Sequence, residues 1–348
     1  MKKRILHLLS SNQYSGAENV VLNIIKSLEQ SYEFLYVSPD GSIREVLNEK
    51  KVNYIPLTDN NFASLNSIIK KWKPDIIHAH DFRASIKASF LPCHANKISH
   101  LHQNPTWIRT INIKSILYLL SCIKTDKIVT VSPEVLEEMC FKKIIKAKTH
   151  VLENHINTEA ILKAANAKKL ANPFDLAFVG RLTEVKDPSR FIRIVKKIKE
   201  VKRDIRAVII GDGELRDECE KLINSYDLNH NVELMGFLAN PFPILNNSKI
   251  LVMTSIWEGF GLVAVEAMTL GKPVIAPPVG GLNTIITKES GSLCESDEDF
   301  IKKIRELLNN KDEYEQVSQG AKRNVQKYAN KETWLNSVKF LYENLDGS

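Results

Sequence analysis

No stretch of this sequence approaches the ~20 consecutive apolar residues that a membrane-spanning helix needs, so we expect no transmembrane segment. The first residues, Met1–Leu9, are basic and then apolar, but the apolar part is too short for the core of a secretory signal. The five cysteines are scattered and form no C-x-x-C pair, which argues against a zinc or disulfide framework. Reduced cysteines and the lack of an export signal predict a cytoplasmic protein.

Signatures of three other protein classes are also missing or misplaced. The fingerprint G-x-G-x-x-G is absent, which disfavours a dinucleotide-dependent oxidoreductase, and no RNA-binding or helix-turn-helix pattern supports a nucleic-acid partner. Asp297-Glu-Asp299 matches a D-x-D metal motif but precedes a predicted helix instead of ending a strand, so we interpret it as a helix N-cap. His78-Ala-His80 alternates as some metal sites do, but the sequence shows no evident third ligand, and we predict no metal.

The sequence is long enough for two globular domains, and its surface is mildly basic. Charged residues make up 26% of the 348 residues, and the formal net charge is +7. A solvated lysine-rich surface explains this charge, and so does contact with an anionic membrane or a phosphate-bearing substrate. For the apolar segment Trp107–Ile123 we favour an ordinary packing helix over a membrane-contacting one. For the basic run Lys142–Lys148 the alternatives are a solvated face and a phospholipid-facing patch.

Predicted strands alternate with predicted helices along the whole chain. The first strand, Arg4–Leu9, is followed by a helix over Ala17–Leu28, and the pattern continues to the C-terminal helices. This alternation predicts an α/β fold with parallel, doubly wound sheets, whose ligands bind beyond the carboxyl ends of the strands. The Ala- and Lys-rich segment Lys163–Asn172, followed by a proline, marks the predicted boundary between domains 1–170 and 171–330.

Two cations flank a glycine loop near the start of the second domain. Arg181 follows Gly180 at the end of a predicted strand, and Lys186 precedes a helix predicted over Pro188–Lys199. Asp187 is a natural N-cap for this helix. Two cations beside the free amides of a helix N-terminus are suited to bind a diphosphate.

The stretch Ser255–Gly281 combines glycines, carboxylates and a short apolar helix. A strand over Ile250–Met253 is followed by a loop with Glu258 and then by a helix predicted over Leu262–Leu270. The loop glycines let backbone approach a ligand, and the helix start suits an anion or hydroxyl groups. Glu266 lies within this apolar helix, where a buried unpaired carboxylate is costly, so it either meets a ligand or faces solvent or a lysine.

The pattern from Glu258-Gly-Phe-Gly-Leu to Glu266-Ala-Met, continued by GKPVIA and a Gly-Gly turn, resembles the signature of retaining glycosyltransferases of family 4, the glycosyl transferases group 1. The loop with Arg181 and Lys186 and the segment Met235–Phe237 also resemble this family, as do Ser15-Gly16-Ala-Glu and His102-Gln-Asn. The resemblance spans nearly the whole chain. It implies the GT-B fold, with two Rossmann-like doubly wound domains facing each other across a cleft and residues 331–348 completing the first domain.

The resemblance also implies an activity. A hexose or N-acetylhexosamine would move from a nucleotide-diphosphate sugar, with a UDP-sugar as first choice, to a hydroxyl of a glycan or lipid-linked acceptor. Such a retaining transferase needs no cofactor and no divalent metal, and it would serve bacterial surface polysaccharide or lipopolysaccharide assembly. Domain 1–170 would bind the acceptor and domain 171–330 the nucleotide sugar. The enzyme would be cytoplasmic, and peripheral contact with the inner face of the cell membrane remains open.

Residue roles follow from the same resemblance. Arg181 and Lys186 would neutralise the leaving diphosphate, Glu258 would accept hydrogen bonds from the sugar, and His102 would lie near the transferred sugar or be a satisfied loop histidine. Glu266 would hold the ribose hydroxyls. The rest of the implied donor site consists of Gly16, Met235, Gly236, Phe237, Gly259, Phe260, Gly261 and Leu262. Alternatives are a non-catalytic sugar-nucleotide-binding subunit of a glycan synthase and a GT-B epimerase or phosphorylase.

Overall fold

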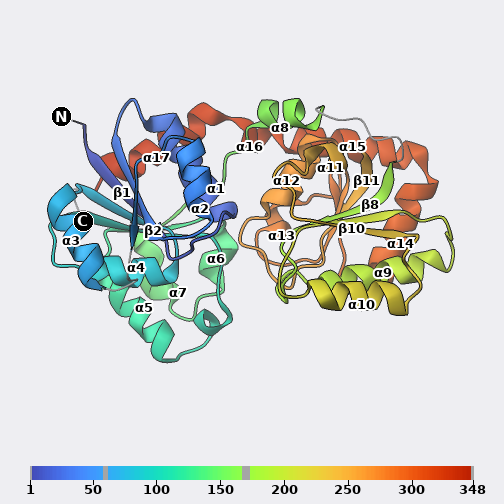
Figure 1. Ribbon diagram of the computed structural model, residues 1–348, viewed down its shortest axis with the longest axis horizontal. Helices are drawn as coiled ribbons and strands as arrows, with labels where there is room; N and C mark the ends of the chain where they lie inside the picture. Colours follow the sequence, from blue (N-terminus) through green and yellow to red (C-terminus); the bar gives the residue numbers. More distant parts are fainter. Residues whose placement is uncertain (1, 58–61, 167–172, 346–348) are drawn as a thin grey trace. The chain divides into compact units, whose positions relative to one another are not determined.

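The computed structural model describes residues 2–57, 62–166 and 173–345, and the chain divides into two α/β units (Figure 1). The first unit is Met1–His155 together with Lys331–Ser348, and the second is Ile156–Asn330. The division falls between residues 155 and 156, whereas the boundary expected at residue 170 lies outside the described residues. The reason is helix α8 (Thr158–Ala165), which packs against α11 (Phe242–Asn246) and α12 (Leu262–Thr269) of the second unit.

The first unit is built on a sheet of seven parallel strands in the order β3-β2-β1-β4-β5-β6-β7. From β1 the order runs outward through β2 and β3 on one side, and the chain then returns to place β4 on the other side. The point where the order reverses therefore lies between β1 and β4. The strands are β1 (Arg4–Leu8), β2 (Glu33–Pro39), β3 (Tyr54–Leu57), β4 (Ile76–Ala79), β5 (Asn96–Leu101), β6 (Lys127–Thr130) and β7 (Thr149–Val151).

Helices cover both faces of this sheet. One face packs against α1 and α17, so residues from both ends of the sequence share one core, and the other packs against α3 and α4. Figure 1 shows α17 lying beside α1. The helices of this unit are α1 (Gly16–Leu28), α2 (Ile43–Glu49), α3 (Phe62–Trp72), α4 (Phe82–Ser89), η1 (Thr106–Arg109), α5 (Ile113–Ile123), α6 (Pro133–Glu137), α7 (Lys142–Ile145), η2 (Lys146–Lys148) and α17 (Lys331–Glu343).

The second unit repeats the architecture with six parallel strands in the order β10-β9-β8-β11-β12-β13. Here the order reverses between β8 and β11, which are hydrogen-bonded neighbours. The strands are β8 (Phe174–Val179), β9 (Ala207–Ile210), β10 (Val232–Gly236), β11 (Ser248–Val252), β12 (Val274–Ala276) and β13 (Gly291–Leu293). Both units therefore have the predicted α/β architecture of parallel, doubly wound sheets.

Branched and aromatic side chains from α9, α10 and α14 form the core on one face of the second sheet. Helix α12 packs against β12, α13 and α15, and α11 packs against β11. The remaining helices of this unit are α9 (Pro188–Lys199), α10 (Arg216–Ser225), α13 (Leu282–Ile285), α14 (Asp297–Asn309), α15 (Lys311–Asn324) and α16 (Gln326–Ala329). None of the helices in the described ranges is long and apolar enough to cross a membrane.

The N-terminal capping residues of α9 and α14 can be compared with those predicted from the sequence. Helix α9 begins at Pro188 as predicted, and the Asp187 carboxylate accepts a hydrogen bond from the Arg190 amide. At α14 the capping residue is Ser296, one position before the predicted D-x-D cap. Ser296 and Asp299 form a reciprocal capping box, because a serine hydroxyl in extended backbone reaches the third amide of the helix. The D-x-D residues thus lie in the first turn of a helix.

Helix α5 differs most from expectation. The ordinary packing helix that we favoured would bury its aliphatic residues, but α5 buries its small and polar ones, namely Ser115, Tyr118, Ser121 and Cys122. Its large aliphatic side chains are exposed: Ile113 at 85%, Ile116 at 41%, Leu117 at 40%, Leu120 at 48% and Ile123 at 69%. The sequence also predicted one helix from residue 107, whereas Asn112 caps a separate helix after the short η1 turn.

Candidate functional site

Most of the predicted site residues lie in loops at the carboxyl ends of the second sheet. Arg181 and Lys186 follow β8, Glu258 follows β11, and the segment Met235–Phe237 ends β10. Because β8 and β11 are neighbours where the strand order reverses, their loops lie side by side. In open parallel sheets this reversal is the usual place for a ligand.

Lys186 and Glu258 form the central contact between these loops. The Lys186 ammonium lies 2.5 Å from Glu258 Oε1, and the Ser255 hydroxyl donates to the same carboxylate oxygen at 2.7 Å. Both side chains are sheltered, with exposed fractions of 24% for Lys186 and 9% for Glu258. The Thr254 hydroxyl joins the loops again by donating to the Lys186 and Asp187 carbonyls. A cation and a carboxylate, 72 residues apart in sequence, are thus held in fixed positions.

Arg181 is exposed, and its guanidinium makes no hydrogen bond or ion pair with any residue of the described ranges. Its loop joins β8 to the N-terminus of α9, where positive potential from backbone amides gathers. An exposed guanidinium beside such a terminus is available for bidentate binding of a phosphate group. Arg181 therefore has the position and freedom that its predicted role requires.

Glycines set the shape of the loop that precedes α12. Gly261 occupies the N-cap position with φ of +96°, in the left-handed region that side chains with a Cβ rarely adopt. Gly280 packs against the same loop so closely that a Cβ would come 1.8 Å from the Glu258 carbonyl oxygen. Only a glycine pair lets the segment after β12 hold this loop, and the Gly281 amide donates to the Glu258 carbonyl at 3.1 Å.

Glu266 lies near the middle of α12 and is half-buried. Its carboxylate makes no hydrogen bond or ion pair with another residue of the part described. Of the predicted alternatives, Glu266 is therefore partly exposed to solvent but is not paired with a lysine there. Burial raises the pKa of Glu266 to about 7. A carboxylate that is sheltered without donors gains from a ligand that brings hydroxyl groups.

Gly16 and His102 belong to the first unit. Gly16 is the first residue of α1, and the preceding Ser15 hydroxyl bonds to the buried Glu18 carboxylate. His102 directly follows β5 and is half-buried, with its Nε2 atom 3.1 Å from His80 Nδ1. Burial lowers the pKa of His102 to about 3, so its ring is neutral at pH 7. His102 is therefore hydrogen-bonded to another histidine and belongs to a larger cluster of histidines.

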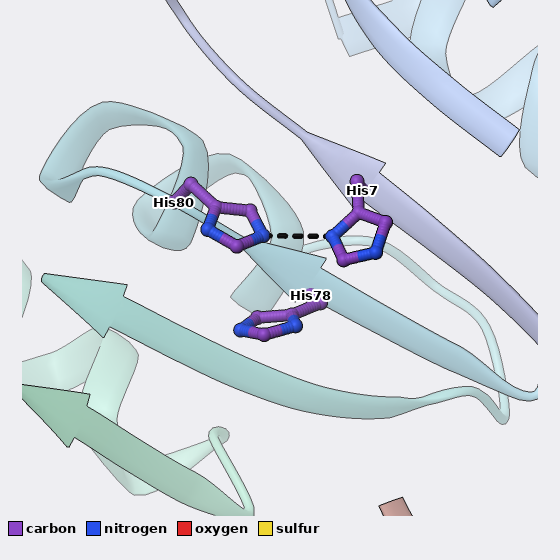
Figure 2. A group of neighbouring side chains, drawn as sticks. All are labelled: His7, His78 and His80. Atoms are coloured by element: carbon purple, nitrogen blue, oxygen red, sulfur yellow. Dashed lines mark hydrogen bonds between the residues drawn. The ribbon is translucent and has the colours of Figure 1, made fainter. Parts of the chain in front are cut away.

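That group contains five histidines on one face of the first sheet, contributed by β1 and by the ends of β4 and β5. One row of hydrogen bonds joins His7 to His80 at 2.8 Å (Figure 2) and continues from His80 to His102 at 3.1 Å. A second row joins Tyr342 Oη to His78 at 2.9 Å and His78 to His100 at 3.2 Å. The prediction that His78 and His80 lack a third potential ligand is wrong, because strand register brings histidines from β1 and β5 beside them.

The sequence matches two glycosyltransferase family models. The family model described as Glycosyl transferases group 1 matches residues 125–324, and the model described as Glycosyltransferase Family 4 matches residues 14–160. An uncharacterized glycosyltransferase of Methanocaldococcus jannaschii is 30% identical over 289 residues, which cover 73% of this chain and 71% of the relative.

The chain belongs to the glycosyl transferases group 1. A relative of this glycosyltransferase in Escherichia coli, UDP-Gal:alpha-D-GlcNAc-diphosphoundecaprenol alpha-1,3-galactosyltransferase, is 26% identical over 327 residues, 84% of each chain. The crystal structure of Anabaena HepE in complex with UDP superimposes with a TM-score of 0.84 at 18% identity, covering 98% of this chain and 99% of HepE. The predicted family and the two-domain GT-B fold are thus confirmed.

Within this glycosyltransferase, the structure gathers part of the predicted site. The second unit carries Arg181, Lys186, Met235–Phe237, Glu258–Leu262 and Glu266 in loops, or on a helix, that begin at one end of its sheet. Gly16 and His102 are at the corresponding strand ends of the first unit. Phe237 is 68% exposed, so its side chain is not packed into the unit. The roles of all these residues stay predictions.

The sequence interpretation missed the residues that support this glycosyltransferase's site. The Ser255 hydroxyl donates to the Glu258 carboxylate, and the Thr254 hydroxyl donates to the Lys186 carbonyl. Short polar side chains directly after an apolar strand were a signal that these residues support a loop. His7 and His100 were also missed. His7 pairs in register with His78, and His100 lies two residues before His102. Only the pairing of the strands shows that these histidines form one group.

Proposed function

We propose that this chain is a retaining, metal-independent glycosyltransferase that moves a hexose or N-acetylhexosamine from a UDP-sugar to a hydroxyl of a glycan or lipid-linked acceptor. The observation that carries the proposal is the Lys186–Glu258 pair between the loops after β8 and β11, with the unpaired Arg181 on the same loop as Lys186. We place the reaction in bacterial surface polysaccharide or lipopolysaccharide assembly. The E. coli relative is named for a UDP-galactose donor and a diphosphoundecaprenol-linked acceptor, which supports this choice.

In the proposed reaction the bond between the anomeric carbon and the diphosphate oxygen breaks, and the acceptor oxygen forms the new bond on the same face of the sugar. The hydroxyl proton passes to the departing phosphate oxygen. Arg181 and Lys186 stabilise the negative charge that develops on the diphosphate, in place of a metal ion. Glu258, held by Ser255 and Lys186, accepts hydrogen bonds from the donor sugar.

Further contacts complete the donor site as we propose it. The first amides of α12 receive the sugar and phosphates, because a helix N-terminus leaves these groups without intrahelical partners. Glu266 receives the ribose hydroxyls, which supply the hydrogen-bond donors that its carboxylate lacks. Backbone at Met235, Gly236 and Phe237 lies beside the base. The first unit contributes Gly16, His102 and the acceptor-binding surface.

The test is turnover by the purified full chain in EDTA. UDP- and GDP-sugars are screened for release of the nucleoside diphosphate, with and without a crude lipid-linked acceptor fraction. Lys186→Ala removes the proposed phosphate cation, and Lys197→Ala, on the exposed face of α9, is the matched control. Release from one donor that survives EDTA and Lys197→Ala but is lost in Lys186→Ala supports the proposal. An NMR assay of the product's anomeric configuration tests retention, and an inverted product would contradict it.

We also propose that the enzyme works at an anionic membrane surface, at the inner face of the cell membrane. The exposed aliphatic face of α5 supports this, because a helix with its apolar side outward needs an apolar neighbour. No aspartate or glutamate occurs between Asp81 and Asp126, while this segment holds six lysines and arginines: Arg83, Lys87, Lys97, Arg109, Lys114 and Lys124. An apolar helix face within an acid-free basic segment matches a surface of anionic lipid headgroups.

A further inference from the structure

The first unit has a switch point of its own, between β1 and β4, and the five histidines are gathered there. We propose that His80, His100 and His102 form a binding site for one divalent transition-metal ion of the zinc class. This site lies in the first unit, whereas the loops with Arg181, Lys186 and Glu258 are in the second unit. The donor's diphosphate keeps Arg181 and Lys186 as its counter-charges, so the metal site shares only His102 with the proposed transferase residues.

The ligand atoms are already close together. One ring nitrogen from each of the three histidines lies within 4.8 Å of the others, and His80 Nδ1 is 3.1 Å from His102 Nε2. Zinc binds histidine nitrogen at about 2.0–2.1 Å in tetrahedral geometry, which separates two ligand nitrogens by roughly 3.4 Å. The His100 Nε2 atom is buried and has no hydrogen-bond partner among the described residues. A metal ion would give this nitrogen the partner that it lacks.

In two of the three ligands, His80 and His100, the other ring nitrogen is held by a hydrogen bond, as a metal site requires. His80 Nε2 bonds to His7 Nδ1, and His100 Nδ1 bonds to His78 Nε2. His78 in turn bonds through Nδ1 to the Tyr342 hydroxyl. If His80 and His100 donate from these second nitrogens, His80 Nδ1 and His100 Nε2 are both left with free lone pairs. Such outer hydrogen bonds fix tautomer and ring orientation in histidine metal sites.

A second trio, His7, His78 and His80, also has ring nitrogens within 4.8 Å of one another (Figure 2). It is a poorer site, because both nitrogens of His78 are bonded to groups outside this trio, Tyr342 and His100. All three members are also fully buried, which leaves no approach for an ion or a fourth ligand. His102 is half-buried instead, so the proposed trio has a side from which an ion enters and a water completes four-coordination.

A metal ion bound at this site should inhibit the transferase, and this expectation rests on the proposed function. His102 is the histidine that we place among the transferase residues, and an ion bound to its Nε2 withdraws that nitrogen from any other role. Added Zn²⁺ is therefore expected to lower turnover, while EDTA leaves it intact. Zn²⁺ inhibition that weakens in His7→Phe, a residue outside the proposed transferase site, in parallel with metal binding would tie the two together.

The test of the site measures binding and needs no activity. The full chain is dialysed against Co²⁺, whose visible absorption reports four-coordinate nitrogen ligation, and the bound metal is counted; Zn²⁺ then displaces the Co²⁺. We expect one ion per chain. His102→Gln, at a half-buried position, should remove the absorption. His94→Gln, at an exposed histidine of the same unit, should keep it. A metal-free wild type, or equal binding by His102→Gln, overturns the proposal.

A second variant separates this role from folding. His7→Phe removes only the outer partner of His80 and should weaken Co²⁺ binding about 10–100-fold without changing the one-to-one stoichiometry. Circular dichroism of each variant verifies that the first unit is folded. Unchanged affinity in a folded His7→Phe contradicts the tautomer argument. Failure of the donor screen leaves the Co²⁺ result intact, and the reverse also holds, so the two proposals fail separately.

Discussion

The Lys186 ammonium and the Glu258 carboxylate are each the main charge partner of the other in the second unit. Both groups are sheltered, so removing one leaves the other charge partly desolvated and without a partner. This destabilises the folded state more than replacing both charges by neutral groups does. In a double-mutant cycle with Lys186→Met and Glu258→Gln, we expect a coupling energy of about 1–2 kcal/mol in urea unfolding.

The exposed pair Lys197–Glu200, at the C-terminal end of α9, serves as the matched cycle, with exposed fractions of 59% and 56%. Its coupling should stay below about 0.5 kcal/mol, since water screens exposed pairs. Equal coupling in the two cycles would mean that the Lys186–Glu258 contact is an ordinary surface ion pair. Lys186 would then have no fixed position from which to meet a phosphate.

Glu266 gives the donor site a pH dependence. Its pKa is about 7, so only about a tenth of the carboxylate is ionised near pH 6 and about nine-tenths near pH 8. If the ionised form accepts hydrogen bonds from the ribose, UDP affinity should rise about tenfold between these values. Glu266→Gln should bind UDP weakly and without this rise. Calorimetry at both pH values measures the effect, and a wild-type affinity that falls with pH would contradict it.

Stability offers a second readout of the same group, with the opposite sign. Burial raises the folded-state pKa of Glu266 above the ordinary value of 4.5, so the folded chain holds this proton to higher pH than the unfolded chain does. The stability linked to Glu266 is complete below about pH 4.5 and is lost as the pH rises through about 7. The wild type should therefore lose stability relative to Glu266→Gln across this window in parallel denaturant titrations.

At the scale of single elements, α5 carries the membrane prediction. Ile113→Glu and Ile123→Glu place a charge on its exposed aliphatic face and should weaken binding to anionic vesicles about ten- to hundredfold each, given the apolar burial that each side chain would lose. Flotation with phosphatidylglycerol vesicles measures this. Binding should also weaken with salt, because exposed charges are screened.

The matched control is Val201→Glu, which replaces a similarly exposed aliphatic residue of the second unit, 59% exposed. It should bind vesicles as the wild type does. If Ile113→Glu leaves vesicle binding unchanged but turns a dimer into a monomer in gel filtration, the face of α5 contacts a second copy and the membrane proposal is wrong.

Element by element, the sequence predicted what depends on neighbours in sequence. The helix that begins at Pro188 and the loop before Leu262 follow from capping residues and glycines a few positions away. The orientation of α5 could not be predicted, because its buried side is made of Ser115, Tyr118, Ser121 and Cys122, which hydropathy ranks below the aliphatic face. Only contact with the rest of the unit decides which side turns inward.

For the whole molecule, the return of α17 to the first unit makes the C-terminal segment essential to that unit. Trp334, Val338, Leu341 and Tyr342 are buried in its core against α1 and the sheet. A chain ending at Asn330 should lose the cooperative unfolding of the first unit and keep that of the second. Calorimetry of the full and shortened chains tests this, and two intact transitions in the shortened chain would contradict it.

The paired parallel sheets could be predicted from alternating strands and helices, since that pattern is written along the whole sequence. The site could be predicted only in part. Lys186 and Glu258 were each found from local motifs, but their contact, across 72 residues, required strand order. The histidine group required more, because it combines the register of β1, β4 and β5 with a tyrosine from α17. Side chains that meet through register leave no local pattern.

The division of the chain into units also affects the order of events on the ribosome. The second unit is one continuous segment, Ile156–Asn330, whereas the first cannot finish until Lys331 and its successors emerge. Synthesis of the roughly 190 residues after His155 takes about 10–40 s at ~5–20 residues per second. For that interval the nascent chain exposes the apolar sheet face that α17 later covers, so the portion made first is the last to mature and the one in need of chaperones.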